Sequence, residues 1–269
     1  LAQSYEALSQ WDLAAEQLLI IVTNEKPGPL KREALYTAAE YYLKAGDNSN
    51  ALSTFRTYAK TYPQPFDVAQ EVRFKMSEFY HQSSEQYYWF RQILSFDRKQ
   101  LQLDPNAIQA RQIELASIAA FALAEAEQRS FVAIKLNAPL QKSLKRKQDT
   151  MKKAIGYYQQ VLDFQLAKYV PHATYNLAEM YRQLAADMMS SQRPSDLDEL
   201  AQEEYEILLE ELAYPFEEKA IEIHVSNTQR AWEDIYDQWI EKSFNRLAEI
   251  SPALYQKSEL THEVIDAIH

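Results

Sequence analysis

Two Glu-x-x-His pairs are the residues in this chain best spaced for metal chemistry. They are Glu78–His81 and Glu259–His262. A carboxylate-bridged di-iron site takes two such pairs and two further glutamates, all facing one helical core. The chain is rich in glutamate and the second pair falls in a predicted tail, so chance explains both pairs. We therefore predict no metal site and no cofactor.

The other residues that could do chemistry also lack a catalytic pattern. The sequence contains no HExxH, GxSxG or GxxxxGK[ST] motif. It contains no cysteine, which excludes disulfides and thiol catalysis. His224 lies on the apolar side of a predicted helix, where a hydrogen-bonded packing role is favoured over a ligand role. We predict a protein that is not an enzyme and has no catalytic residues.

Composition predicts an all-α fold. The 269 residues include only three glycines, whereas strands and tight hairpins need many more. Ten prolines are spread along the chain and read as breaks between helices. The formal net charge of −11 disfavours binding to nucleic acid or to an anionic membrane. No apolar run approaches the ~20 residues that span a bilayer, so we predict no membrane insertion.

A helical hairpin over residues 31–65 gives the repeating unit. Its apolar residues recur every three or four positions on both sides of Gly46, which can take the positive φ that ends a helix. These positions are Leu35, Ala38, Ala39 and Tyr42, then Ala51, Phe55 and Tyr58. A similar spacing runs from Leu1 to Pro27, and the pattern resembles the tetratricopeptide repeat of about 34 residues. We expect a fragment of a longer array, because the first copy lacks the front of its first helix.

The whole chain is predicted to be a tetratricopeptide-like α-solenoid, a right-handed superhelix of helical hairpins with a C-terminal helical cap. The predicted repeats cover residues 1–28, 29–65, 66–104, an extended 105–170, and 171–194 onward. Capping helices follow over 195–257 and a tail over 258–269. Within the cap, Pro215 is expected to end one helix and to begin another that reaches Ile250, about 50 Å long.

The outward side of each first helix should line the concave surface of such an array. By helical position this surface takes Glu6, Tyr36, Glu40, Lys44, Glu78, His81, Asn176 and Gln183. Mixed polar and aromatic groups suit an extended peptide, held by side-chain hydrogen bonds and stacking. The alternative is that a solvated face is simply polar.

Three further stretches each allow a packing interpretation and a binding interpretation. The aromatic run Tyr87–Phe90 could pack between repeats or form a protein-binding patch. The basic cluster Lys142–Lys153 could be a solvated helix end, or could dock an acidic partner or the acidic segment downstream. That segment, 196–222, holds eleven acidic residues and one lysine, and could be a solvated face or attract a partner.

The end of the chain carries a more specific resemblance. The residues that carry it are Tyr205–His224, Asn227, Arg230, Ile235–Asp237, Trp239, Lys242–Phe244, Leu247–Ala248, Pro252–Ala253 and Tyr255. Residues 147–257 are similar to the C-terminal part of large tetratricopeptide proteins encoded beside TonB, ExbB and ExbD genes in gamma-proteobacteria.

The resemblance implies a periplasmic protein that acts as a non-enzymatic adaptor in a TonB–ExbB–ExbD energy-transduction system for outer-membrane uptake. Its partners would be periplasmic segments of TonB or ExbD. Alternatives are a cell-envelope or outer-membrane assembly scaffold unrelated to TonB, the substrate-recruiting repeat region of a larger enzyme, and a structural role within a homo-oligomer.

Overall fold

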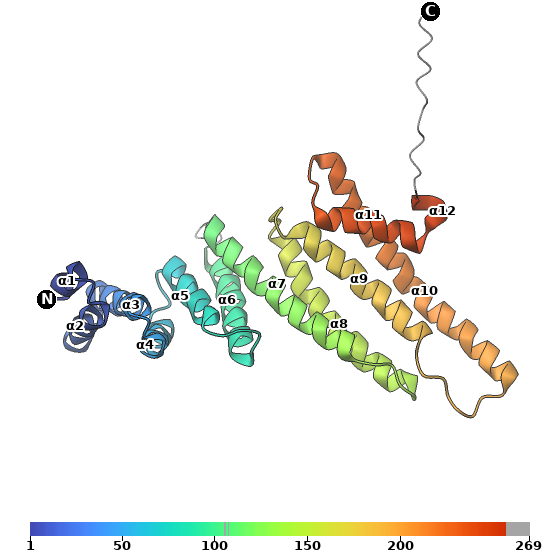
Figure 1. Cartoon of the computed structure of the whole chain (residues 1–269), viewed down its shortest axis with the longest axis horizontal. Helices are drawn as coiled ribbons and strands as arrows, with labels where there is room; N and C mark the ends of the chain where they lie inside the picture. Colours follow the sequence, from blue (N-terminus) through green and yellow to red (C-terminus); the bar gives the residue numbers. More distant parts are fainter. Residues whose placement is uncertain (105, 107, 257–269) are drawn as a thin grey trace, which may run out of the picture. The chain divides into compact units, whose positions relative to one another are not determined.

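The computed structural model describes residues 1–104, 106 and 108–256, and this part of the chain is helical, without strands (Figure 1). It divides into two compact units, Leu1–Ala126 and the part from Glu127 onward. The division falls inside α7 and not at a predicted repeat boundary. The predicted tail, 258–269, lies outside the described residues, as do Lys257 and Pro105.

The first unit is helical, and its helices from α1 to α6 pack on their neighbours in the chain. Its helices are α1 (Ala2–Ala7), α2 (Trp11–Asn24), α3 (Pro29–Lys44), α4 (Asn48–Thr61), α5 (Phe66–Glu78), α6 (Ser84–Leu103) and most of α7 (Ala110–Ala133). The helices α1 and α2, α3 and α4, and α5 and α6 each pack together as a helical hairpin.

Local sequence fixes the turn between α3 and α4. Gly46 has φ +78°, which glycine adopts without steric cost, and the amide of Asp47 returns to the Tyr42 carbonyl. Asp47 then caps α4, because its carboxylate accepts the Asn50 N–H at 3.0 Å. The turn predicted from Gly46 is confirmed.

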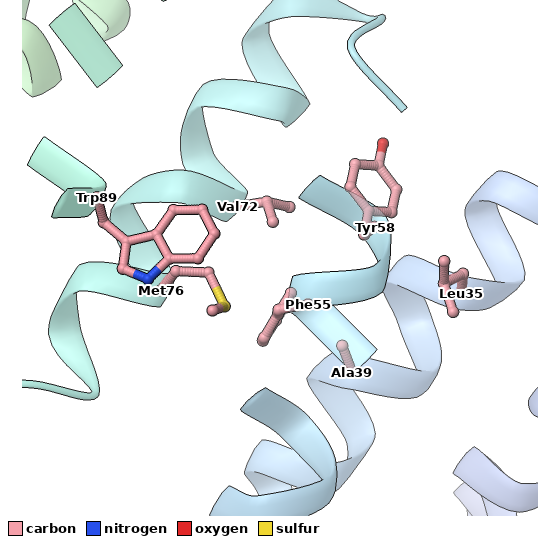
Figure 2. Packing of buried hydrophobic residues seen from close by; sticks show 7 residues of the cluster. All are labelled: Leu35, Ala39, Phe55, Tyr58, Val72, Met76 and Trp89. Carbon is pink, nitrogen blue, oxygen red and sulfur yellow. The ribbon is translucent and has the colours of Figure 1, made fainter. Parts of the chain in front are cut away.

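The core of the first unit contains the predicted apolar positions. Leu35, Ala39, Phe55 and Tyr58 are buried together with residues of the next hairpin, as Figure 2 shows. A neighbouring cluster buries Ala38, Tyr42 and Ala51 with Ala14 and Ala15 of α2. Each hairpin therefore buries its apolar face against the next, as repeat stacking requires.

The second unit contains the end of α7, followed by α8 (Leu140–Asp163), α9 (Val170–Met189), α10 (Glu199–Gln229), α11 (Gln238–Ile250) and α12 (Pro252–Tyr255). Helix α10 packs along α9, and α11 contacts both of them (Figure 1). All-helical packing of sequence neighbours is compatible with an α-solenoid.

The prediction of one long helix over residues 216–250 is wrong. Pro215 lies inside α10, and the break falls later, at the short 3₁₀ turn Arg230–Glu233 and at Asp234, whose φ is +59°. An internal proline costs a helix about 3 kcal/mol, and we attribute its tolerance to packing of α10 against α9. Asp237 then starts α11 by accepting the N–H groups of Trp239 and Ile240.

Candidate functional site

Partly exposed acidic and basic side chains form ion pairs along one face of the first unit, from α3 across α5 to the start of α7. Glu40 Oε1 lies 3.0 Å from Lys75 Nζ. Arg111 donates to both oxygens of Glu71, at 2.7 and 3.3 Å, and to Glu114 at 2.9 Å. We call these five residues the charge ladder. Hydrogen bonding to Glu71 raises the pKa of the Arg111 guanidinium.

Tyr36 stands at the α3 end of the charge ladder. Its ring lies edge-on to Phe55 and Tyr58, with centroids 6.1 and 5.8 Å away. Burial, followed by the charge of Glu40 and a hydrogen bond to it, raises the pKa of Tyr36 to about 12. The phenol therefore stays neutral and serves as a fixed polar contact on an apolar base.

A hollow of about 520 Å³ opens beside the ladder. Its lining includes Arg32, Tyr36, Asp67, Glu71, Arg111 and Gln112. Helices α3, α5 and α7 supply most of this lining, so side chains that are far apart in sequence meet around one space. Charges of both signs, an amide and a phenol can hold the backbone and side chains of an extended segment. We call the ladder and this hollow the groove.

The predicted concave residues of the first unit fall into three places. Tyr36 and Glu40 lie in the groove. Lys44 is exposed above the Trp11 ring, 4.5 Å from its centroid, and also above Tyr41, whose pKa is raised to about 12 by burial and by hydrogen bonding to Glu6. Glu78 and His81 are exposed at the end of α5 and in the turn that follows, and neither lines the groove.

The other two predicted residues belong to the second unit. Asn176 is buried, not exposed to a ligand, and donates to the Tyr158 hydroxyl at 3.0 Å. A buried phenol needs a polar partner, and Asn176 meets that need. Gln183 donates to Asp187 at 2.8 Å. Both side chains therefore make contacts inside the second unit.

Sequence reasoning missed Glu71, Lys75 and Arg111. A usable signal was present, because Glu71 and Lys75 each lie 35 positions after Tyr36 and Glu40, which is one repeat. The prediction continued the surface at Glu78 and His81 instead, one to two turns further along α5. Arg111 does not lie 35 positions after a matching residue, because α6 and the connection after it are longer than α4 and the connection after that helix.

A second set of charged residues is buried in the second unit. Lys147 is fully buried, and its Nζ donates to the Phe131 and Ile134 carbonyls at 2.8 and 2.7 Å. Asp187 lies 2.6 Å from the same nitrogen. Phe131 is in the last turn of α7, where backbone carbonyls lack helical partners. Lys147 therefore joins α7, α8 and α9. The neighbouring cations are exposed, namely Lys142, Lys145, Arg146, Lys152 and Lys153, and their exposure fits both a solvated helix end and a docking patch.

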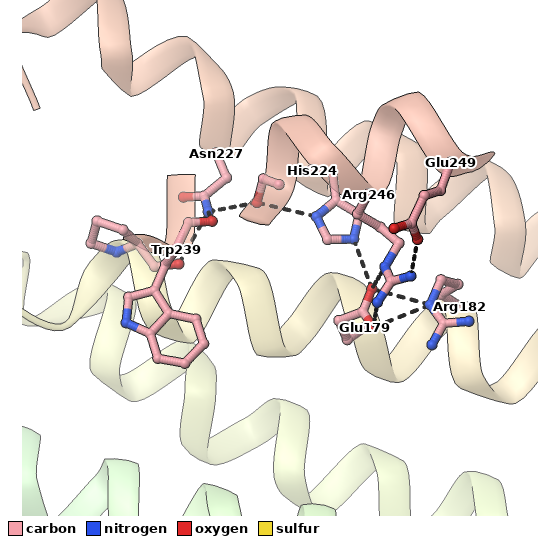
Figure 3. A network of polar contacts seen from close by, with 9 residues as sticks. Glu179, Arg182, His224, Asn227, Trp239, Arg246 and Glu249 are labelled. Carbon is pink, nitrogen blue, oxygen red and sulfur yellow. Dashed lines mark hydrogen bonds and ion pairs between the residues drawn. The ribbon is translucent and has the colours of Figure 1, made fainter. Parts of the chain in front are cut away.

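Figure 3 shows the other buried network, which centres on Glu179 of α9. Its carboxylate accepts from Arg246 at 2.9 Å and from Arg182 at 3.1 Å, and lies 3.2 Å from His224 Nε2. Burial alone would raise the pKa of Glu179, but the hydrogen bonds of His224 and Arg182 and the charges of Arg182 and Arg246 lower it to about 2. Glu179 therefore stays ionised and ties α10 and α11 to α9.

This network also has the donor–acceptor order of a hydrolytic triad, because His224 Nδ1 lies 3.2 Å from Ser243 Oγ. Ser243 and His224 are fully buried, and Asn227 donates to the same hydroxyl at 3.0 Å. The hydroxyl is thus enclosed between helices and has no open face toward a substrate. The predicted hydrogen-bonded packing role of His224 is confirmed.

The three ambiguous stretches take distinct places. Within Tyr87–Phe90, Trp89 and Phe90 are buried, while Tyr88 is 49% exposed. The acidic segment 196–222 includes Asp198, which is the N-cap of α10, and the first part of that helix. That part of α10 also exposes Leu200, Ile207, Leu208, Leu212 and Tyr214. Among the described residues, no ion pair joins this segment to the exposed cations of α8.

The groove brings charged and aromatic side chains of α3, α5 and α7 around one open hollow. No protein-family model and no curated protein matches the chain. Among the described residues, no cluster of three histidine, aspartate or glutamate side chains could hold a metal ion, and Glu259–His262 falls outside them. In the same part of the chain, no helix has the length and apolarity to cross a membrane.

Proposed function

We propose that this chain is a non-enzymatic protein-interaction scaffold that holds an extended segment of a partner protein in the groove. The charge ladder is the observation that carries the proposal. Its ion pairs are partly exposed, with 27% of both the Glu40 and Lys75 side chains open to solvent. Exposed pairs add little to stability, since surface ion pairs contribute about 0–1 kcal/mol. They remain free to exchange partners with a bound segment.

The scaffold proposal extends to the repeat family. Hairpins that stack on their sequence neighbours, with polar first-helix faces, support a tetratricopeptide-like solenoid of right-handed sense with α10–α12 as its cap. By the resemblance of residues 147–257, the partner is a periplasmic segment of TonB or ExbD, and the site of action is the periplasm. No metal, cofactor or nucleic acid takes part in this mechanism.

Calorimetry of the full chain with the periplasmic part of TonB tests this proposal. Saturable binding that weakens as ionic strength rises is expected, because the ladder pairs are screened by salt. Arg111→Ala should weaken binding about tenfold, or about 1.4 kcal/mol. Arg98→Ala, an exposed arginine on α6 outside the groove, is the matched control and should bind as wild type.

The outcomes separate the partner from the surface. Binding that both arginine variants weaken equally contradicts the groove, while binding without salt dependence contradicts the electrostatic mechanism. Absence of TonB binding together with groove-dependent binding of the ExbD periplasmic part rejects the first partner and keeps the scaffold. If neither TonB nor ExbD binds, the alternative of an envelope scaffold unrelated to TonB is favoured.

A further inference from the structure

A second hollow, of about 620 Å³, lies among α4, α5 and α6 and is separate from the groove. Its charged lining consists of Arg56, Lys60, Arg73 and a single carboxylate, Glu85. Glu85 lies beside Ser84, whose hydroxyl donates to it at 2.9 Å. The hollow is therefore locally basic in a chain whose formal net charge is −11.

Arg73 is the unusual member of this lining. Only 5% of the residue is exposed, and its guanidinium donates hydrogen bonds to the Ala69 and Ala59 carbonyls, at 2.6 and 3.3 Å. Its guanidinium also lies over the Phe96 ring, 3.6 Å from the centroid. In the described part of the chain, no carboxylate forms an ion pair with it. Burial accordingly lowers the pKa of Arg73 to about 10.

A buried cation without a counter-ion is costly, because neutral carbonyls replace only part of its hydration. The Ala59 carbonyl lies in the last turn of α4, so Arg73 has a structural part as a helix cap. This capping role does not neutralise the positive charge of Arg73. An anion in the adjoining hollow would supply the missing charge, and Arg56 and Lys60 at the rim would add to the attraction.

The other residues that line the hollow indicate which chemical group the ligand carries next to its anion. Tyr80, Tyr88 and Trp89 line the hollow, and Tyr88 lies edge-on to Trp89 with centroids 5.1 Å apart. Arg56 donates to the Tyr80 hydroxyl at 3.2 Å, which positions its guanidinium at the rim. Aromatic walls favour an aromatic or apolar group. Guanidinium groups pair with planar carboxylates through two parallel hydrogen bonds. The volume lies within the range of small-molecule sites, about 300–1,000 Å³.

We propose that this hollow binds a carboxylate carried next to an aromatic ring, with Arg56, Lys60 and Arg73 facing the anion and Tyr88 and Trp89 facing the ring. Two sources present this chemistry, namely a free aryl carboxylic acid and a protein chain that ends in an aromatic residue. The site is separate from the groove, since the two hollows share no lining residue.

Titration of the full ¹⁵N-labelled chain with N-acetyl-L-phenylalanine tests the site, with the Trp89 indole N–H as reporter. We expect saturable shifts of this signal. The amide of the same compound keeps the ring and lacks the charge, and should bind at least about tenfold more weakly. Equal affinity for acid and amide would overturn the proposal. Inorganic phosphate that shifts Trp89 as strongly as the acid would overturn the carboxylate assignment.

Two double variants separate recognition from folding. Arg56→Gln with Lys60→Gln removes exposed rim charges and should weaken binding at least about fivefold without loss of stability. Arg98→Gln with Lys99→Gln removes an exposed arginine and lysine of α6 outside the lining and should leave affinity unchanged. Affinity that survives the first pair, or falls equally with both, would contradict the assignment.

A pentapeptide that ends in phenylalanine then distinguishes the two sources. Binding at least as tight as that of the free compound identifies a chain terminus as the ligand. Tighter binding of the free compound identifies a small molecule. Absence of Trp89 shifts with both ligands overturns the site.

Discussion

The charge ladder of the first unit and the buried networks of the second unit use the same residue types at similar distances. Glu71 and Arg111 meet at 2.7 Å on the surface, and Lys147 and Asp187 meet at 2.6 Å with the lysine fully buried. Exposure separates the two sets. Water competes with each surface pair, so those side chains can be given to a ligand at little cost.

The buried pairs have no such alternative. Two carbonyls and a carboxylate replace the water that Lys147 loses on burial. Removal of any one of these groups leaves another buried polar group without its partner. Ion pairs are thus partly exposed in one unit and form a buried joint between helices in the other. The predictions below test this difference, from the largest expected effect to the smallest.

Lys147→Ala should destabilise the second unit by about 3–5 kcal/mol, because it leaves Asp187 and two carbonyls without their buried partner. Urea unfolding measures the effect, and exposed Lys145 provides the matched control. Lys145→Ala should change stability by less than about 0.5 kcal/mol. Similar losses from both lysines would contradict the joint assigned to Lys147. Lys147→Met with Asp187→Leu should recover part of the loss, since no charge stays buried.

Glu179→Gln should cost about 2–3 kcal/mol at neutral pH, because charge-assisted hydrogen bonds to His224, Arg182 and Arg246 are weakened. The folded pKa of Glu179 is about 2 and its ordinary value is 4.5. Its contribution is therefore fully present above pH 4.5 and is lost as pH falls toward 2. Urea midpoints across this range should fall more steeply for wild type than for the variant.

Glu222→Gln serves as the control for that series. Glu222 is 68% exposed and pairs with Lys219 on the same helix. This variant should keep the wild-type pH dependence, and a flattened profile would assign the effect to surface charge in general.

His172 tests a milder form of burial. Its ring stacks on Trp239, with centroids 3.5 Å apart, and burial followed by the charge of Lys242 lowers its pKa from 6.5 to about 4. The folded state thus favours the neutral ring, and this contribution is present above pH 6.5 and declines as pH falls toward 4. A proton NMR titration of the imidazole measures the pKa directly.

Lys242→Gln should raise that pKa toward its ordinary value, since it removes a neighbouring positive charge. His172→Phe keeps a stacked ring and should flatten the stability profile between pH 6.5 and 4. A His172 signal that titrates near pH 6.5 would contradict the burial argument.

Arg111→Ala should have the smallest effect on stability, below about 1 kcal/mol, although it removes two ion pairs. Thermal unfolding measures it beside Lys147→Ala. The same variant is expected to weaken partner binding. Arg111→Ala should therefore affect binding more than stability, whereas Lys147→Ala should mainly affect stability. A loss of stability equal to that of Lys147→Ala would place Arg111 among the structural joints.

The sequence predicted the helical hairpins well, because their signals are local. The spacing of Leu35, Ala38 and Ala39 gives the buried face of α3, and Gly46 gives the turn. Pro215 misled the same reasoning. Its local preference is to end a helix, whereas in the structure α10 runs through it along α9.

The site was predicted in part for the same reason. Tyr36 and Glu40 follow from the outward face of one helix. Lys75, which pairs with Glu40, and Glu71, which lines the same hollow as Tyr36, come from the next hairpin, and helix-by-helix reasoning chose the wrong turn of α5. Asn176 shows most clearly where prediction from sequence fails. Its polar side chain predicts exposure, but in the structure it is buried and hydrogen-bonded to the phenol of Tyr158.

By itself the sequence determined which segments become helices and which of their faces are apolar, because propensity, spacing and caps act within a few residues. Only the tertiary structure decided which charges stay exposed in the groove and which are buried with Lys147 and Glu179. Burial depends on what a second helix places opposite each side chain, and for Glu179 those partners, His224 and Arg246, lie 45 and 67 positions away in the chain. The same glutamate or lysine is therefore open to solvent or part of a buried joint according to its neighbour in space.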